Sequence, residues 1–286
     1  MKIGIMFANV GPFGTPEVLT PFAQAADEAG IESLWTVEHV AVPVGYESTY
    51  PYSPTGKMPG PENSSIPDPL LPLAFAAAVT KKIRFGTGIL ILPQRHPIYV
   101  AKEAATLDQL SGGRFTLGIG IGWLAEEFAA LGVPFDDRAS RTRESVEAMR
   151  ALWKDGPYAH DGKFFSWPAI ESNPKPVQKG GIPIVIGGHT DIAAKRAARY
   201  GDGFFPAIPD LTKLDHLKGV MAAECAKVGR DPGEIELSIG GVATLDYVKQ
   251  CQDLGVSRIG IPPMGFDIDS IRKGLDKLND EVLSKL

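Results

Sequence analysis

Short apolar runs alternate along this chain with longer segments in which apolar residues recur every three or four positions. Runs of the first kind are typical of buried strands, and segments of the second kind are typical of helices that pack on one face. Strands are predicted at residues 2–8, 32–36, 83–92, 114–119, 183–186, 203–205, 234–240 and 258–261. Helices are predicted at residues 15–29, 68–79, 97–110, 123–131, 139–154, 192–200, 211–228, 245–254 and 268–283.

The regular alternation of strands and helices predicts an α/β fold, a closed (β/α)8 TIM barrel with insertions at the C-terminal face. A doubly wound sheet is the main alternative, but it requires a G-x-G-x-x-G fingerprint after the first strand. The first loop, residues 9–15, contains only Gly11 and Gly14. We therefore expect residues 1–286 to form a single barrel domain.

Two connections are too long to be simple turns. Residues 40–67 are rich in proline and carry Tyr46, Tyr50 and Tyr52, while residues 156–181 carry further aromatic residues. Barrel active sites lie at the carboxyl ends of the strands, so residues 40–67 are predicted to form a lid over the pocket. A plain surface loop is the alternative. Residues 156–181 are predicted to be an insertion.

Composition narrows the classes of function. The net charge of −5 and the lack of a basic stripe argue against nucleic acid as a partner. No apolar stretch reaches ~18 residues, so no membrane partner is expected. The two cysteines, Cys225 and Cys251, show no metal-ligand spacing, and the N-terminus lacks the pattern of a signal peptide. These features predict a cytoplasmic protein that acts on a small molecule.

Polar residues and glycines gather directly after the predicted strands, where a barrel holds its active site. Glu38 and His39 follow the second strand, and the G-x-G-x-G run at residues 118–122 follows the fourth. The fifth strand ends in "IVIGGHT", residues 184–190, just before a helix. A glycine pair at a helix N-terminus presents backbone N–H groups with no side chain in front of them. Such an arrangement is typical of a phosphate cradle.

Three segments carry a family resemblance. They are "SLWTVEHV", "GTGILILPQRHPIYVAKEAATLDQLSGGRFTLGIGIGW" and "IPIVIGGHTDIAAKRAARYGDGFF". They resemble the bacterial-luciferase-like superfamily and, within it, the F420-dependent oxidoreductases. The resemblance implies a (β/α)8 barrel with an insertion, a flavin or deazaflavin at the C-terminal face, hydride chemistry at its ring, and a homodimer.

The resemblance also implies roles for individual residues. His39 and Glu38 would be catalytic, with the histidine near the hydride-transfer centre and the acid against the ring system. The cofactor-binding residues would be Gly88, Ile89, Gly120, Gly122, Gly187, Gly188, His189 and Thr190. A cis peptide is expected between the first two of these residues, and the cofactor phosphate is expected on the last four. Plainer interpretations remain open: a backbone-bonded loop histidine, a solvated acid, a β-bulge and a helix N-cap.

One position departs from the sugar-phosphate dehydrogenases of that branch, which carry a catalytic glutamate directly after the G-x-G-x-G run. Trp123 stands at that position here, and Glu126 and Glu127 on the next helical turn are interpreted as surface or packing acids. A phosphorylated sugar is therefore not expected as the substrate. An apolar substrate pocket is predicted, lined by Phe13, Tyr46, Trp123, Met264 and Phe266.

The predicted function is an oxidoreductase that transfers a hydride between coenzyme F420 and a small, largely apolar organic substrate. Two alternatives remain open: an FMN-dependent luciferase-like monooxygenase, and a flavin- or deazaflavin-binding protein without turnover. The charged tail of F420 favours basic groups near the pocket, and the candidates are Arg95, Lys195 and Arg196. A metal-dependent barrel enzyme that uses Glu38, His39, His96 and His189 is disfavoured because the sequence has no H-x-H pair, and no metal is expected.

Overall fold

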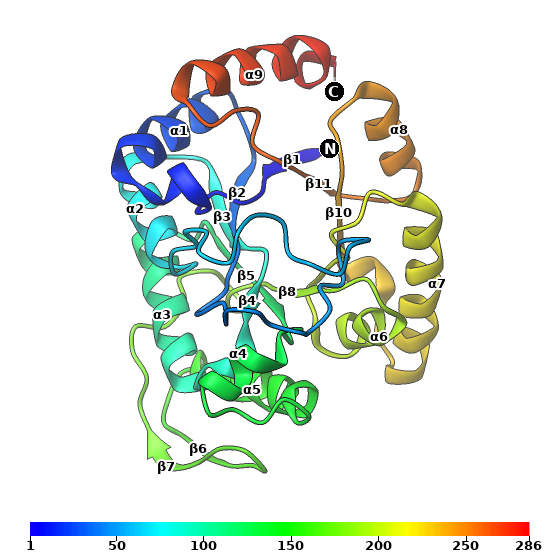
Figure 1. Ribbon diagram of the computed structural model, residues 1–286. Coiled ribbons are helices and arrows are strands. Elements are labelled where there is room, and N and C mark those ends of the chain that lie inside the picture. The colour runs from blue at the N-terminus through cyan, green and yellow to red at the C-terminus, as the bar shows by residue number, and fades with distance from the viewer. Residues whose placement is uncertain (286) are drawn as a thin grey trace.

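The computed structural model describes residues 1–285, which form a closed barrel of eight parallel strands surrounded by helices (Figure 1). Pairing of the first strand with both the second and the last closes the barrel. In order around it, the strands are β1 (Lys2–Ile5), β2 (Ser33–Thr36), β3 (Arg84–Thr87), β5 (Phe115–Gly120), β8 (Ile184–Gly187), β9 (Gly203–Phe205), β10 (Glu236–Gly240) and β11 (Arg258–Ile261). The predicted TIM barrel is confirmed.

The helices surround the barrel and lie close to their predicted bounds. They are α1 (Pro16–Glu28), α2 (Leu71–Val79), α3 (Pro97–Leu110), α4 (Ala125–Ala130), α5 (Arg138–Leu152), α6 (Asp191–Tyr200), α7 (Leu211–Val228), α8 (Leu245–Asp253) and α9 (Ile268–Glu281). Within residues 1–285, no helix combines the length and the hydropathy that a bilayer span requires.

Two predicted strands differ from the structure. The segment predicted at residues 83–92 is divided into β3 and the short β4 (Leu90–Ile91), and the peptide bond between Gly88 and Ile89 is cis, as expected. The strand predicted at residues 2–8 ends at Ile5, and Phe7 adopts a φ of 60°. Apolar residues continue beyond the true end of this strand, so the sequence pattern could not show where pairing stops.

The insertion at residues 156–181 contains an antiparallel hairpin that the sequence analysis did not predict, formed by β6 (Tyr158–Asp161) and β7 (Ser166–Ile170). His160 Nε2 lies 3.2 Å from Glu144 Oε1 on α5, and the His160 ring stacks on Trp167 with 4.8 Å between centroids. The hairpin projects beyond α5 at the bottom of Figure 1. Its strands are half-exposed and short, so they lack the apolar run that marks a barrel strand.

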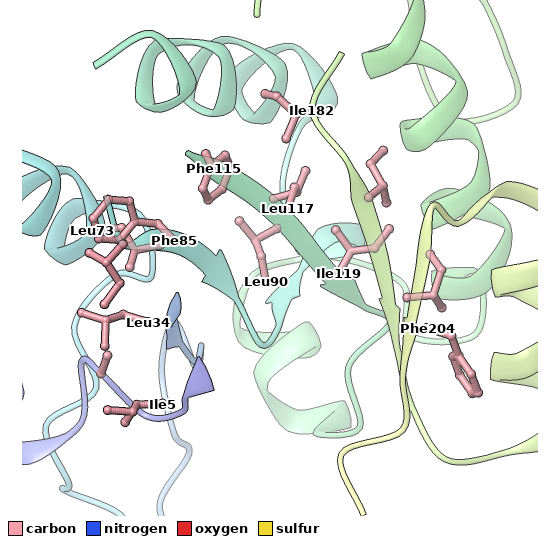
Figure 2. Packing of buried hydrophobic residues seen from close by; sticks show 14 of the residues in the cluster. Ile5, Leu34, Leu73, Phe85, Leu90, Phe115, Leu117, Ile119, Ile182 and Phe204 are labelled. Atoms are coloured by element: carbon pink, nitrogen blue, oxygen red, sulfur yellow. The ribbon is translucent and has the colours of Figure 1, made fainter. Parts of the chain in front are cut away.

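The main core lies between the barrel strands and the inner faces of the helices. Figure 2 shows Phe85, Phe115 and Leu117 in it, and each has 0% of its surface exposed. A second, small cluster consists of Met6, Trp35, Val185 and Phe205. A Cβ on Gly86 would lie 2.5 Å from the indole of Trp35, so glycine at this position makes room for that ring.

Residues 40–67, which connect β2 to α2, cross in front of the barrel strands in Figure 1 and form neither helix nor strand. Hydrogen bonds within the segment stabilise its conformation. The hydroxyl of Tyr46 accepts a hydrogen bond from the N–H of Met58 at 2.9 Å, and the N–H of Gly45 donates to Glu62 at 3.0 Å. The position of residues 40–67 in front of the barrel strands agrees with the predicted lid. That this segment covers the pocket during function stays a prediction.

Candidate functional site

A buried carboxylate holds the ring of His39 at the end of β2. His39 Nδ1 lies 3.0 Å from Oε2 of Glu127 on α4. The other oxygen of Glu127 accepts hydrogen bonds from the N–H groups of Val40 at 2.6 Å and Ala41 at 3.1 Å. Glu127 has 0% of its surface exposed. Of the two interpretations of Glu127, the structure excludes a surface acid, and the buried carboxylate holds both the ring of His39 and the first residues of the loop.

The charge of Glu127 determines which nitrogen of His39 carries the proton. Burial raises the pKa of Glu127, but the hydrogen bonds from His39 and Ala41 outweigh burial and hold the pKa below its ordinary value of 4.5. Glu127 is therefore ionised at neutral pH. An ionised carboxylate only accepts hydrogen bonds, so Nδ1 of His39 is the donor and Nε2 is left to exchange a proton elsewhere.

Glu38 lies under the same loop, and both of its carboxylate oxygens are engaged. Oε1 accepts from Nε of Arg95 at 2.9 Å and also from its Nη2, while Oε2 accepts from the N–H of Ile91. Arg95 Nη2 also donates to Asp68 at 2.7 Å. Burial raises the pKa of Glu38 although the charge of Arg95 opposes it. Glu38 is thus a buried acid rather than a solvated one, and the guanidinium of Arg95 is paired within the chain.

Trp123 lies at the centre of an aromatic cluster beside His39. The centroid of its indole is 5.5 Å from the ring of His39, 5.5 Å from Tyr46 and 5.2 Å from Tyr50, and each contact is edge-on. Tyr46 is 5% exposed. The structure thus gathers two of the predicted substrate residues, Tyr46 and Trp123, around the predicted catalytic histidine.

Glu126 fastens the middle of the loop at residues 40–67 to α4. Its Oε1 accepts from the N–H groups of Glu47 at 2.7 Å and Ser48 at 3.0 Å, and its Oε2 accepts from the hydroxyl of Ser48 at 2.6 Å. The hydrogen bond from the Ser48 hydroxyl, together with the backbone donors, lowers the pKa of Glu126 to about 2. An acid in the first turn of a helix is also stabilised by the helix dipole. Two adjacent acids of α4 therefore hold two points of one loop.

Replacing Glu126 by alanine removes the acceptor for all three of these donors. We expect the loop to be cleaved about tenfold faster in limited proteolysis. The reason is that the free energy of local opening falls by about the contribution of one charged hydrogen bond. The thermal unfolding midpoint should change little, since the barrel itself is untouched. The exposed first-turn acid of α1 provides a matched control, Glu17→Ala. Equal cleavage rates in both variants would show that Glu126 does not hold the loop.

The turn after β8 has the geometry of an anion cradle. Gly188 has a φ of +126°, a conformation that side chains rarely adopt, and the hydroxyl of Thr190 accepts from the N–H of Ala193 at 3.2 Å as the N-cap of α6. The N-cap interpretation of Thr190 is therefore confirmed. Nδ1 of His189 is buried and, within residues 1–285, has no hydrogen-bond partner. Not every N–H is available, because Gly188 donates to the carbonyl of Phe205 at 3.2 Å.

Side chains from α6, α7 and the loop at residues 40–67 surround the turn after β8. Burial lowers the pKa of His189, and Lys213 on α7 acts in the same direction, so a positive charge lies nearby. Asp191, the first residue of α6, is paired with Nε2 of His216 at 2.9 Å. The ring of Tyr52 meets the ring of His189 with 4.6 Å between centroids. The loop at residues 40–67 therefore reaches from the surroundings of His39 to the cradle.

Ile89 fills the space over two of the predicted cofactor-binding glycines. A Cβ on Gly120 would lie 2.6 Å from Cδ1 of Ile89, and a Cβ on Gly187 would lie 2.5 Å from its Cγ2. At Gly122, whose φ is +78°, the nearest atom to such a Cβ belongs to Phe128. These glycines thus make room for side chains of the chain itself. Contact of the cofactor with them stays a prediction.

The remaining predicted substrate residues form a separate group. Phe13 is 1% exposed and packs on Phe22 with 4.8 Å between centroids. The ring centroids of Phe266 and Phe13 are 6.2 Å apart, and Phe266 is 71% exposed. Met264 packs beside Gly274. Sequence could not separate this group from the residues around Trp123, because both follow strand ends.

The metal alternative gains no support from the arrangement of the side chains. Nδ1 of His96 accepts a hydrogen bond from the N–H of Ile98 at 3.3 Å, as the N-cap of α3. Within residues 1–285, no group of three or more His, Cys, Asp or Glu side chains is placed to hold a metal ion.

Relatives cover most of this chain. An uncharacterized protein of Mycobacterium tuberculosis is 33% identical over 276 residues, which are 93% of this chain and 94% of that protein. The oxygenase component of a flavin-dependent trigonelline monooxygenase from Acinetobacter baylyi is 36% identical over 167 residues, which are 57% of this chain and 40% of that protein.

Solved structures share the fold at low identity. A monooxygenase from Streptomyces bottropensis has a TM-score of 0.77 and 23% identity, over 100% of this chain and 99% of that chain. An F420-dependent secondary alcohol dehydrogenase, solved with an F420–acetone adduct, has a TM-score of 0.77 and 18% identity, over 99% and 98% of the two chains. The model of the luciferase-like monooxygenase family matches residues 1–247. The chain therefore belongs to the luciferase-like monooxygenase family.

Proposed function

We propose that this protein is an oxidoreductase that uses coenzyme F420 to transfer a hydride to or from a small, largely apolar organic substrate. The observation that carries the proposal is the pair of His39 and buried Glu127, which lies against the edge of Trp123. A histidine fixed by a carboxylate at one nitrogen is suited to proton transfer at the other.

The turn after β8 fits the phosphate that F420 and FMN both carry. The orphaned Nδ1 of His189 and the positive φ of Gly188 are the supporting observations. The helix N-terminus adds its partial positive charge, typically about 0.3–1 kcal/mol. Residues 187–190 would hold the phosphate, and Ile89 would contact the ring.

When bound, F420 supplies a deazaflavin ring that accepts or donates the hydride. Nε2 of His39 would take the proton from the substrate during oxidation and return it during reduction. The aromatic cluster of Tyr46, Tyr50 and Trp123 would exclude water and favour an apolar substrate. Glu38 would act as a positioning residue, because its oxygens are engaged by Arg95 and Ile91.

The alternative is an FMN-dependent monooxygenase, which the 36% identity to the trigonelline monooxygenase component favours. Both cofactors present the same phosphate, so the turn after β8 cannot distinguish them. The test is a binding titration of the purified protein with F420, FMN and FAD. We expect micromolar or tighter binding of F420 that weakens with salt, because its tail is charged. Tight FMN binding without F420 binding would move the function to the monooxygenases, and binding without substrate-dependent turnover would indicate a carrier.

The homodimer implied by the resemblance stays a prediction. The structure supports it with apolar side chains that project to solvent from α2 and α3, where Leu71 is 71% and Tyr99 is 70% exposed. A mass of one chain by light scattering would exclude it.

A further inference from the structure

A cavity of about 240 Å³ lies on the outside of the barrel, between α5 and α6. Ser140 and Arg143 of α5 form one wall, and Ile192, Lys195 and Arg196 of α6 form the other. In Figure 1, α5 lies at the bottom of the barrel and α6 lies at its lower right. The cavity therefore begins within the first turn of the helix that follows the cradle.

Part of the positive charge in this cavity has no counter-charge within residues 1–285, although Arg143 is paired with Glu147 at 4.0 Å. Within residues 1–285, no carboxylate forms an ion pair with Lys195 or Arg196. Burial lowers the pKa of Arg196, so its guanidinium is held partly out of water without a counter-charge. Arg199 is engaged by Glu224 at 2.7 Å. A half-buried cation without a partner is unfavourable unless an anion joins it.

Tyr200 provides a second and independent observation. It lines the cavity and is 9% exposed, and its hydroxyl is buried without a hydrogen-bond partner in residues 1–285. Burial raises the pKa of Tyr200 to about 12, so the hydroxyl stays protonated and able to donate. The charges of Arg196 and Arg143 act to lower this pKa, and the charge of Glu147, the partner of Arg143, acts to raise it. A buried O–H among guanidinium groups lacks an acceptor, and a carboxylate is the acceptor that satisfies both kinds of donor.

We propose that this cavity binds carboxylates of the oligoglutamate tail of F420. The inference rests on the proposed function and names a contact that FMN, which ends at its phosphate, does not make. Arg196 lies five residues after the start of α6, about 8 Å along the helix. Two extended residues span roughly 7 Å, so a lactyl group and a first glutamate reach from the cradle to Arg196. The tail would replace solvent along α6 and supply the missing counter-charge.

The test compares three probes by calorimetry at low and high salt. They are F420 with several glutamates, its precursor that ends at the lactyl group, and a free γ-linked glutamate oligomer. Arg196→Gln is expected to weaken full-length F420 about tenfold and to leave the precursor unchanged. Tyr200→Phe should weaken the full-length form a few-fold without lowering the thermal unfolding midpoint. An exposed lysine on α8 gives the matched control, Lys249→Gln, which should change nothing.

The outcomes separate the cavity from the proposed function. Equal affinity for F420 and its precursor, or an equal loss of both in Arg196→Gln, would overturn the tail site and leave the F420 function standing. Failure of F420 to bind, together with binding of the glutamate oligomer to the wild type and not to Arg196→Gln, would overturn the function and keep the carboxylate site. Failure of every probe to bind would overturn both.

Discussion

Replacing His39 by alanine is expected to lower turnover by about 10²–10⁴, which is the usual value of a positioned general acid or base. Cofactor affinity should stay within a few-fold, because the cradle after β8 is formed by other residues. The loss arises because Nε2 of His39 no longer exchanges the proton that accompanies the hydride. Steady-state turnover and a cofactor titration on the same preparation measure the two effects separately.

A variant of Glu127 tests the same proton-transfer step, because Glu127 acts through His39. Glu127→Gln places an amide where one carboxylate oxygen accepts from His39 or from the loop, so we expect a smaller loss of about 10–100-fold. The double variant should be no slower than His39→Ala alone, since both changes remove one function. Lys249→Ala, on the exposed surface of α8, is the control. Full turnover in His39→Ala would make the histidine a bystander, and a large fall in its thermal unfolding midpoint would make it structural.

Replacing Gly188 by aspartate is expected to lower cofactor affinity by about two orders of magnitude. A carboxylate about 5 Å from a phosphate is unfavourable by about 3 kcal/mol at an effective dielectric constant of about 20. Part of the loss should disappear at high salt, because screening weakens the repulsion. Fluorescence titration of the cofactor at two salt concentrations measures the effect.

Gly188→Ala separates charge from backbone strain. Gly188 has a φ of +126°, and a Cβ there would lie 3.0 Å from the Cβ of Ala193, so both variants share the same strain. Only aspartate adds the charge. The difference between the two affinities therefore measures the repulsion between the added carboxylate and the cofactor phosphate. Equal affinities in the alanine and aspartate variants would place the phosphate elsewhere.

The sequence by itself determined the barrel and the outline of the site. Helices with a strong apolar period, such as α6 and α8, were predicted to within one residue of the bounds that the structure shows, because a periodic face leaves little freedom. The strand ends at residues 38–39 and 187–190 could also be placed at one face, since the carboxyl ends of parallel strands meet there. The hairpin formed by β6 and β7 escaped prediction because its short strands are half-exposed.

Tertiary structure alone decided which side chains meet. The pairing of His39 with Glu127 joins residues 88 positions apart, and no local pattern distinguishes that acid from its neighbour Glu126, which holds another part of the loop. Burial, which only the packed fold supplies, excluded the alternative of a solvated acid for Glu38 and made it the partner of Arg95.

The same reason explains the cavity between α5 and α6. The sequence offered Lys195 and Arg196 as candidate basic groups for the charged tail of F420, but it gave no reason to single out Tyr200. Their joint position against Ser140 and Arg143 depends on how α5 and α6 pack on the outside of the barrel. Periodicity specifies which face of each helix is buried. Only the packing of both helices on the barrel determines what lies between them, because desolvation and charge balance are properties of the assembled fold.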